Sequence, residues 1–255
     1  MRRFIKHYPT VAACQAAADH HRWLASCLRV PQLLGVGDRW LDFEHIDGHP
    51  PTPAELSGVA CHLGTVHGTM FGRELHAARL DIPYDTGDGS RIADFLRPRR
   101  SVVADRLSRG TVPDPAYTAP EADHILASAV DLPAVIYKDT NIRNVLLTDD
   151  GPVHLDFDDL TLAPPGYDLA KLLLSAAMTH GPQATFVFDA ALRQYDAALS
   201  NMGAAPCGPD RLAGWLEIHH ILTAPYLGRH GYRHSWHQLR QRSMGAEPHV
   251  STDPW

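Results

Sequence analysis

The sequence is poor in the features that mark membrane, secreted and nucleic-acid-binding proteins. No apolar run approaches the roughly 18 residues that a membrane-spanning helix needs, and the opening MRRFIKHYP is too short and too polar for a signal peptide. We therefore expect a cytoplasmic protein without membrane association. The 29 Asp and Glu outnumber the 23 Lys and Arg, which gives a formal net charge of −6. Nucleic-acid-binding proteins usually carry a basic surface, so no nucleic-acid partner is expected.

Common metal and phosphate signatures are also missing. The four cysteines are scattered and none forms a CxxC pair, so neither a zinc site nor a disulfide framework is indicated. The 17 histidines occur without the HExxH spacing that places two ligands on one helix face. No GxxxxGK[ST] segment occurs, which excludes a P-loop kinase.

The patterns that are present indicate a chain of both helices and strands whose last third is helical. With 255 residues the chain can form one large domain or two lobes with a real core. Strands are expected to end at 4–6 and to cover 30–36 and 40–46, and a break follows at 47–51. Helices are expected at 11–27, capped by Thr10, and at 53–67, 92–107, 120–130, 167–179, 182–200, 209–222 and 235–242, with loops over the rest of 80–120 and a loose tail after Gly245.

The informative segment is IYKDTNIRNVLLTDDGPVHLDFDDLTLAPPGYDLAKLL. Asp139 follows an expected strand over 134–137, and Asn144 comes five residues later. Two further strands, 144–147 and 153–155, flank a turn at 149–151, and Asp156 follows the second of them. Such a hairpin brings Asn144 and Asp156 to one point, and their oxygens suit Mg²⁺. Asp139 faces the same point and could take a proton from a hydroxyl group during phosphoryl transfer.

These residues resemble the aminoglycoside phosphotransferase and choline kinase family, relatives of the protein kinases. The family motif HxDxxxxN is matched by Tyr137 to Asn144, and the metal-binding Asp of the family by Asp156. Its DLA segment is matched by Gly166-Tyr167-Asp168-Leu169-Ala170. Three N-terminal segments are similar to the lysine strand, the hinge strand and the helix that ends in Leu-His: Phe4-Ile5-Lys6, Phe43 to Gly48, and Leu63 to His67.

The resemblance implies a two-lobed α+β fold of the protein-kinase kind. Residues 1–47 would form a reduced nucleotide-binding lobe, and residues 48–255 a larger, mainly helical catalytic and substrate-binding lobe. The implied reaction moves the γ-phosphoryl group of ATP or GTP to a hydroxyl of an antibiotic-like or other small substrate, with Mg²⁺. A Ser or Thr of a biosynthetic peptide is the alternative acceptor. The oligomeric state stays open.

The resemblance also implies a role for each matching residue. Asp139 would be the catalytic base, Asn144 and Asp156 would hold the metal, and Lys6 would contact the α- and β-phosphates. The resemblance also gives roles to four other residues. Glu44 and Ile46, on the hinge strand, would border the nucleotide, whereas Asp168 and Tyr137 would support the catalytic loop.

The sequence departs from the family pattern in three places. Tyr137 stands where the family has His. The two strands that normally precede the lysine are missing ahead of Lys6. The lysine usually pairs with a helix Glu, and the only acid between Lys6 and Asp38 is Asp19.

Several residues near the motif have two readings. Lys138 and Arg143 could contact phosphate or offset nearby carboxylates. Asp158 and Asp159 could assist the metal or belong to a solvated loop. The helices expected to face the substrate offer aromatic and polar groups without a recognisable signature: Trp215, Glu217, His219, His220, Tyr226 and Trp236.

Two rivals to the kinase interpretation belong to other classes. A degenerate kinase fold that binds without turnover is favoured by the missing strands and opposed by the intact Asp139, Asn144 and Asp156. A metal-dependent hydrolase built on residues 156–159 is the more distant alternative.

Overall fold

The N-terminal lobe is a small antiparallel sheet with one helix against it. In the computed structural model, which describes residues 2–243, the strand order is β1-β3-β2. Helix α1 begins after Thr10, whose hydroxyl accepts a hydrogen bond from the Ala13 amide at 3.1 Å, as the sequence predicted. The elements are β1 (Arg3–His7), α1 (Val11–Leu24), β2 (Leu33–Val36) and β3 (Trp40–Glu44).

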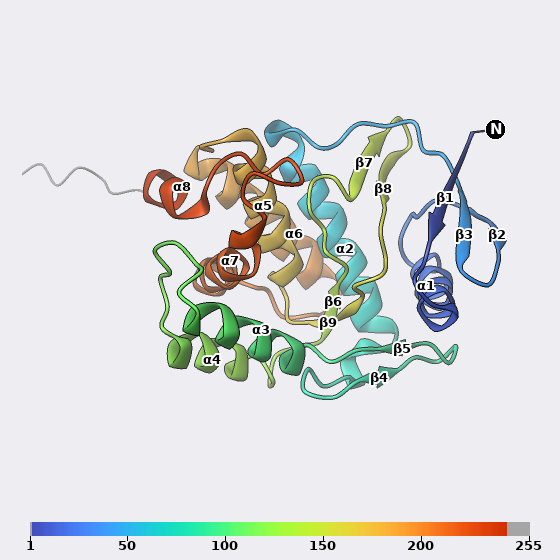
Figure 1. Cartoon of the computed structure of the whole chain (residues 1–255), viewed down its shortest axis with the longest axis horizontal. Coiled ribbons are helices and arrows are strands. Elements are labelled where there is room, and N and C mark those ends of the chain that lie inside the picture. Colours follow the sequence, from blue (N-terminus) through green and yellow to red (C-terminus); the bar gives the residue numbers. More distant parts are fainter. Residues whose placement is uncertain (1, 244–255) are drawn as a thin grey trace, which may run out of the picture.

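The larger lobe is helical, and its centre is α5 (Tyr167–His180). Every residue from Tyr167 to Met178 is buried, so this helix is surrounded by other elements on all sides (Figure 1). The remaining helices, with three short 3₁₀ turns, are α2 (Leu56–Arg73), α3 (Leu96–Ser108), α4 (Ala119–Ser128), α6 (Thr185–Asn201), α7 (Pro209–Thr223) and α8 (Trp236–Ser243), and the turns cover Pro53–Glu55, Leu75–Ala77 and Ala224–Tyr226.

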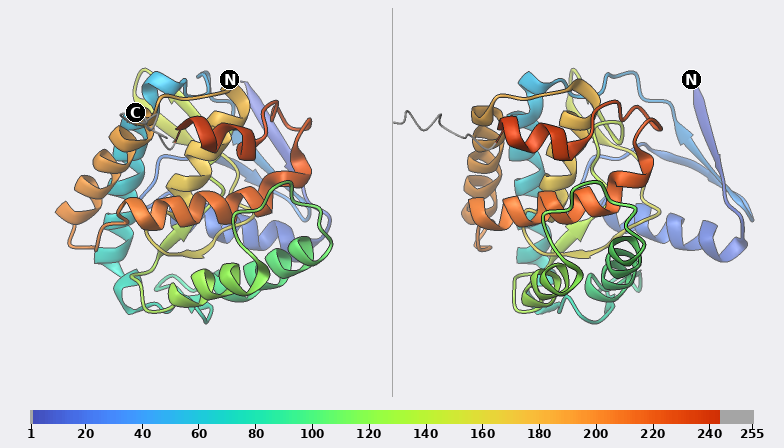
Figure 2. Two further views of the ribbon diagram at one scale, coloured as in Figure 1. Left: turned by 90° about the vertical axis from the view of Figure 1, so that its left-hand side faces the viewer. Right: turned by 60° about the vertical axis from the view of Figure 1, so that its left-hand side comes forward.

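Helices α2 and α6 lie unusually close together because of a glycine. A Cβ atom on Gly64 of α2 would lie 2.4 Å from the carbonyl oxygen of Tyr195 on α6, well inside van der Waals contact. Only glycine permits this approach, and the two helices form the outer layer behind α5 (Figure 2). Figure 2 also shows α3 and α4, in green, side by side below α7.

Two short antiparallel ribbons lie between the lobes and carry the site. In the first, β6 (Val135–Tyr137) pairs with β9 (Thr161–Ala163), and in the second β7 (Val145–Thr148) pairs with β8 (Gly151–His154). Val145 lies opposite His154, and beyond them the Leu155 amide donates to the Asn144 carbonyl at 2.8 Å. This register places Asn144 beside the start of the segment that carries Asp156.

The expected elements are largely present, with two differences. The helix expected at 92–107 starts only at Leu96, because Arg91–Ile92 forms β5 and pairs with β4 (Tyr84–Asp85) inside the region expected to be loop. Strand β9 was not predicted, since its three residues form a strand only by pairing with β6. The tail expected to be loose lies outside the described residues. Across residues 2–243, no helix has both the length and the apolar character that a bilayer crossing demands.

Candidate active site

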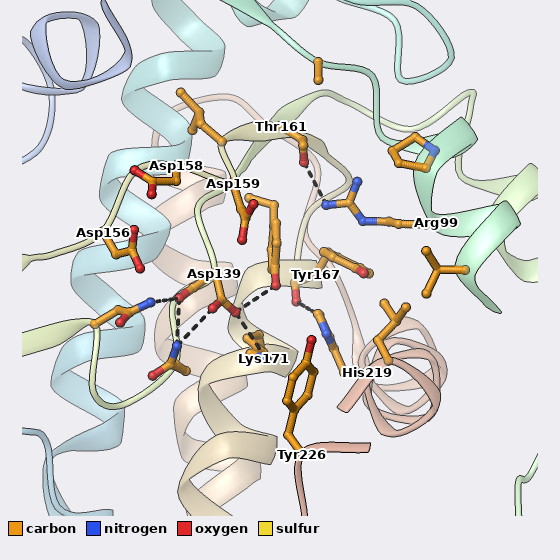
Figure 3. A pocket seen from close by; sticks show the side chains of 18 of the residues that line it. Arg99, Asp139, Asp156, Asp158, Asp159, Thr161, Tyr167, Lys171, His219 and Tyr226 are labelled. Carbon is orange, nitrogen blue, oxygen red and sulfur yellow. Dashed lines mark hydrogen bonds and ion pairs between the residues drawn. The ribbon is translucent and has the colours of Figure 1, made fainter. Parts of the chain in front are cut away.

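Asp139 lies at the bottom of a cleft and is held by three neighbouring side chains. Its Oδ1 accepts a hydrogen bond from the Tyr137 hydroxyl at 2.8 Å and lies 3.2 Å from Nζ of Lys171. Its Oδ2 accepts from Nδ2 of Asn141 at 3.1 Å (Figure 3). The backbone φ of Asp139 is 59°, a left-handed conformation that is uncommon for non-glycine residues and that clusters at functional sites. The carboxylate is thus fixed in position, with acceptor capacity left on Oδ2.

The charge state of Asp139 is set by opposing effects. Burial by itself raises the pKa of this carboxyl, but the Lys171 ammonium and the hydrogen bond from Tyr137 outweigh burial and hold the pKa below its ordinary value. Burial likewise lowers the pKa of Lys171, and the Asp139 charge more than reverses that effect and raises it. Both groups are therefore ionised at neutral pH.

Asn144 and Asp156 project from the base of the β7–β8 hairpin. Nδ2 of Asn144 donates to the backbone carbonyl of Asp139 at 2.9 Å, so the amide ties the hairpin to the catalytic loop and its oxygen remains for another partner. Asp156 also has a left-handed backbone, with φ of 60°. The loop after β6 and the loop after β8 therefore both place an aspartate in strained backbone on the same cleft.

Lys6 reaches across from β1 to this second loop. Its ammonium lies 2.7 Å from Oδ1 of Asp156 and 2.8 Å from Oδ2 of Asp158. Burial lowers the pKa of Lys6, but the hydrogen bonds and charges of the two aspartates outweigh it, and the net shift is upward. Asp19, considered from the sequence as its partner, instead pairs with Arg22 at 2.7 Å. The lysine is thus oriented by Asp156 and Asp158 rather than by helix α1.

Asp168, in the first turn of α5, braces the catalytic loop. Its side chain is fully buried and accepts hydrogen bonds from the Thr140 amide at 2.8 Å and the Thr140 hydroxyl at 2.5 Å. The amide of Lys138 lies 3.5 Å from the same carboxylate. These bonds hold the residues on either side of Asp139, and Asp168 is not among the described residues that line either cavity.

The two cations of the motif occupy different environments. Lys138 is only 1% exposed, and its ammonium donates to the Leu155 carbonyl at 3.1 Å. It lines neither cavity, so its position fits the charge-offsetting alternative and not contact with phosphate. Arg143 lines the larger cavity, stacks on Tyr232 and donates to the Thr179 hydroxyl at 3.2 Å.

Two cavities meet at Asp156. The smaller, about 410 Å³, lies between the sheet lobe and the β7–β8 hairpin and is walled mainly by apolar side chains. The larger, about 760 Å³, opens over Asp139 and is enclosed by the ribbons and by α3, α5 and α7 (Figure 3). Asp156 is the one residue that lines both among those the structure describes. The smaller cavity contains all three residues predicted to contact nucleotide: Lys6, Glu44 and Ile46.

The walls of the larger cavity differ in part from the expectation. Of the aromatic and polar residues expected on the substrate side, His219 and Tyr226 line it. Glu217 instead accepts hydrogen bonds from Trp236 and Arg240 in the interior. Three lining cations were not predicted, namely Lys171 on α5, Arg99 on α3 and Arg91 on β5. Lys171 directly follows the Asp-Leu-Ala segment, and that adjacency was the available signal in the sequence; nothing in the sequence marks Arg99.

The donor set of Asn144 and Asp156 fits a magnesium ion bound together with nucleotide. One amide oxygen and one carboxylate are hard ligands, and Mg²⁺ keeps several waters and takes its other ligands from phosphates. Within residues 2–243 no cluster of three or more His, Cys, Asp or Glu is arranged to hold a metal by itself. The residues therefore suit a cation that arrives with phosphate and not a dedicated protein cage.

Comparison with known proteins identifies the family. The model of the phosphotransferase enzyme family matches residues 2–214. The chain belongs to this family. Its members are phosphotransferases that act on hydroxyl groups, which confirms the predicted enzyme class. No curated protein matches the chain in sequence.

Solved structures with the same fold confirm the predicted architecture of this phosphotransferase. An aminoglycoside phosphotransferase from Streptomyces rimosus, in complex with ADP and streptomycin, is 20% identical with a TM-score of 0.57, and the match covers 86% of each chain. A choline/ethanolamine kinase family protein from Mesorhizobium loti is 17% identical with a TM-score of 0.57, covering 95% of this chain and 79% of the other. An amicoumacin kinase in complex with AMP-PNP and Ca²⁺ is 13% identical with a TM-score of 0.56, covering 88% and 73%. At these identities the likeness establishes the fold.

Proposed function

We propose that this phosphotransferase moves the γ-phosphoryl group of ATP or GTP to a hydroxyl of a small molecule, with Asp139 as the base. The observation that carries the proposal is the junction of the two cavities at Asp156. A nucleotide with its base in the smaller cavity would extend its phosphates past Lys6 and Asp156. Its terminal phosphate would then reach the larger cavity, where Asp139 lies.

The smaller cavity has the composition of a nucleotide-base pocket. Phe4, Phe43 and Leu146 give flat apolar surface, and Glu44 and Ile46 lie on and just after β3, at the passage between the lobes. In this proposal residues 1–47 serve as the nucleotide-binding lobe and residues 48–255 supply the catalytic and acceptor side. Either purine nucleotide can stack in such a pocket.

In the proposed reaction the acceptor oxygen attacks the γ-phosphorus while the bond to the β-phosphate oxygen breaks, releasing the nucleoside diphosphate. Oδ2 of Asp139 accepts the hydroxyl proton, since Oδ1 already holds Tyr137 and Lys171. Strong basicity is unnecessary, because phosphoryl transfer depends mainly on positioning and charge stabilisation. A carboxylate kept ionised by Lys171 meets that requirement.

Lys6, Asn144 and Asp156 supply the charge stabilisation. Lys6 would turn from Asp156 and Asp158 to the α- and β-phosphates when nucleotide binds. Asn144 and Asp156 would hold Mg²⁺, which neutralises phosphate charge. The same residues support a working enzyme over a binding module, because Asn144 lines the same cavity as Asp139 and Lys6 pairs with Asp156 at the junction of the two cavities.

The test is nucleotide consumption and acceptor phosphorylation, the latter by mass spectrometry, against aminoglycosides, peptide and nucleoside antibiotics, choline, sugars and Ser- or Thr-containing peptides. Asp139→Asn should reduce kcat by roughly two to four powers of ten while nucleotide still binds, the usual range for losing a general base. Asp149→Asn makes the same change on the exposed turn of the β7–β8 hairpin and should leave turnover unchanged. Equal turnover in both variants would remove Asp139 from the mechanism.

A further inference from the structure

The larger cavity has a charge distribution that restricts its occupant. Its four carboxylates all come from the catalytic loop and the segment after β8: Asp139, Asp156, Asp158 and Asp159. The first is paired with Lys171, and the next two with Lys6, at the end where the metal and phosphates are proposed to bind. The remaining lining residues that the structure describes contribute no carboxylate. They do contribute arginines, histidines and tyrosines.

Arg99 is the most buried arginine on that remaining wall. Its side chain extends from α3 into the cavity lining and is 7% exposed (Figure 3). One terminal nitrogen donates to the Phe95 carbonyl at 2.9 Å and the other to the Thr161 hydroxyl at 2.7 Å. Among residues 2–243 no carboxylate lies within ion-pair distance of this guanidinium. Five N–H donors are available. Two donate to these oxygens and the Tyr167 hydroxyl is a third neighbour, so the group retains unused donors.

The surroundings of Arg99 hold it in place without neutralising it. The guanidinium carbon lies 4.5 Å from the ring centre of Phe95, 4.9 Å from that of Tyr137 and 4.8 Å from that of Tyr167. Stacked rings stabilise a cation through their negative faces but carry no net charge. A buried arginine is ordinarily paired with an anion, because an isolated buried charge is costly. This one is rigid, desolvated and unpaired on a cavity wall.

Arg99 is also close to the proposed reacting group. The Tyr137 ring, against which its guanidinium is stacked, carries the hydroxyl that is 2.8 Å from Asp139. One tyrosine ring therefore separates the free guanidinium from the proposed base. Arg143 also contributes a guanidinium to the lining, and it too lacks a carboxylate partner within the described part of the chain. The third lining arginine, Arg91, is paired with Asp85.

We propose that the phosphoryl acceptor carries an anionic group, a carboxylate or a phosphate, which binds Arg99 while a hydroxyl of the same molecule reaches Asp139. The inference rests on the proposed function, since it names the class of that reaction's acceptor. A planar guanidinium with donors to spare matches either anion through paired hydrogen bonds. A polycationic acceptor would instead meet arginines on the wall where it needs carboxylates.

The experiment compares four probes that share one hydroxymethyl-phenyl skeleton and differ in charge. They are para-(hydroxymethyl)benzoate, para-(hydroxymethyl)phenyl phosphate, the neutral para-(hydroxymethyl)benzamide and the cationic para-(hydroxymethyl)benzylamine. Binding to the full chain is measured by ligand-observed NMR titration without nucleotide. At least one anion should bind about tenfold or more tightly than the amide, because charge-assisted hydrogen bonds contribute free energies of that size. The amine should bind most weakly. Whichever anion binds better identifies the anionic group.

Variants assign the preference to one residue. Arg99→Gln should remove it and leave amide binding within about threefold, since only the charged contact is lost. Arg97→Gln is the matched control, because Arg97 lies on the same helix with its side chain 78% exposed and outside this cavity. If Arg99→Gln proves unfolded, Arg99→Lys provides the test. Lysine keeps the positive charge but lacks the planar guanidinium that forms paired hydrogen bonds. This variant should therefore weaken anion binding several-fold and leave the affinity for the amide unchanged.

Three results would overturn the proposal: tightest binding of the amine, an anion preference that survives in Arg99→Gln, or amine binding that is lost in Asp159→Asn. Binding requires no turnover, so the two proposals can fail separately. If anions bind preferentially but no compound receives phosphate, the anion site is retained and the proposed kinase reaction is disproved. If a cationic acceptor receives phosphate, with kinetics that are unchanged in Arg99→Gln, the kinase reaction is retained and the anion site is disproved.

Discussion

At the scale of single residues, the chemistry of the site depends on pairs of opposite charge in partly desolvated surroundings. Asp139 with Lys171, and Lys6 with Asp156 and Asp158, are each within about one hydrogen-bond length. Removing one member of such a pair leaves the other charge partly buried without a partner. The free-energy cost therefore includes the desolvation of that charge as well as the lost contact. The pair at Asp139 is the more buried and should be the more sensitive.

Lys171→Met should lower activity most at acidic pH. Asp139 must be ionised to accept a proton, and Lys171 is the main group that holds its pKa below the ordinary value against burial. Removing the ammonium raises that pKa, so the acidic limb of the kcat/KM profile should move to higher pH and kcat should fall about tenfold or more there. The measurement is the pH–rate profile with the acceptor found in the panel.

Lys171→Arg is the control because it keeps the charge. Its acidic limb should remain near that of the unmodified enzyme. An unshifted profile in Lys171→Met, with a normal melting temperature, would show that Lys171 does not set the ionisation of Asp139.

At the scale of elements, the loop that carries Asp139 is held by helix α5, which packs behind it. Asp168 at the start of α5 accepts two hydrogen bonds from Thr140, and Ser175 on the same helix accepts one from the Ile142 amide at 3.0 Å. Because α5 is buried on every side, the loop rests on a rigid support. This explains how a strained backbone at Asp139 can persist.

Asp168→Asn should reduce stability and activity together. Thr140 donates from its amide and its hydroxyl to this carboxylate, and weakening charge-assisted bonds to a fully buried group costs on the order of 1–3 kcal/mol. Thermal and urea unfolding give the stability, and the nucleotide assay gives the activity. Thr140→Val removes one of the two bonds and should cost less. An inactive Asp168→Asn with an unaltered melting temperature would assign Asp168 a direct catalytic role.

A buried histidine group between α2 and β8 makes the fold sensitive to acid. His154 is fully buried, and neither of its ring nitrogens has a hydrogen-bond partner among the described residues. Burial, aided by nearby Lys138 and His62, lowers the pKa of His154 well below its ordinary value, and burial with the same neighbours lowers that of His67 to about 3. The folded state thus excludes protons that the unfolded state binds below about pH 6.5.

Stability should accordingly be greatest above about pH 6.5 and decline as the pH falls, by about 1.4 kcal/mol per pH unit for each such histidine. His154→Leu should reduce that slope and raise the stability at pH 5, because an unsatisfied polar ring is replaced by an apolar side chain. Urea unfolding across this pH range tests it. His124→Leu, on the exposed surface of α4, should leave the slope unchanged. Parallel curves for His154→Leu and the unmodified protein would contradict the assignment.

At the scale of the whole molecule, an ion-pair cluster links the two lobes across the proposed nucleotide path. Lys6 on β1 contacts aspartates 150 residues away in the sequence, and Tyr8 donates to one of them, Asp158, at 3.3 Å. The lysine therefore occupies the approach to Asp156 in the nucleotide-free structure. Nucleotide and metal would have to replace an existing contact, which couples their binding.

Lys6→Met should have opposite effects on the two ligands. Mg²⁺ alone should bind a few-fold more tightly, because the competing cation is gone from Asp156 and Asp158, and the effect is modest because both carboxylates are well hydrated. AMP-PNP should bind about tenfold more weakly without the phosphate contact. Calorimetry with each ligand separately gives both numbers. Arg2→Met changes an exposed cation of the same lobe and should alter neither affinity. Weaker binding of both ligands in Lys6→Met would disprove the competition.

The sequence by itself determined what depends on neighbours along the chain. The helices, the β7–β8 hairpin, and the spacing of Asp139, Asn144 and Asp156 follow from local hydrogen bonding and apolar patterns, and they sufficed for the fold class and the family. The two-residue strands and β9 were missed because their pairing is decided by distant partners.

Tertiary structure decided what depends on packing between distant segments. It paired Lys6 with Asp156 and not Asp19, brought Lys171 to Asp139, and placed an unpaired Arg99 on the acceptor wall. Each of these contacts joins elements at least 30 residues apart, and their approach is set by how helices pack around α5. The sequence pattern does not specify which distant segments pack together. The groups proposed to select the acceptor can therefore be identified only in the folded chain.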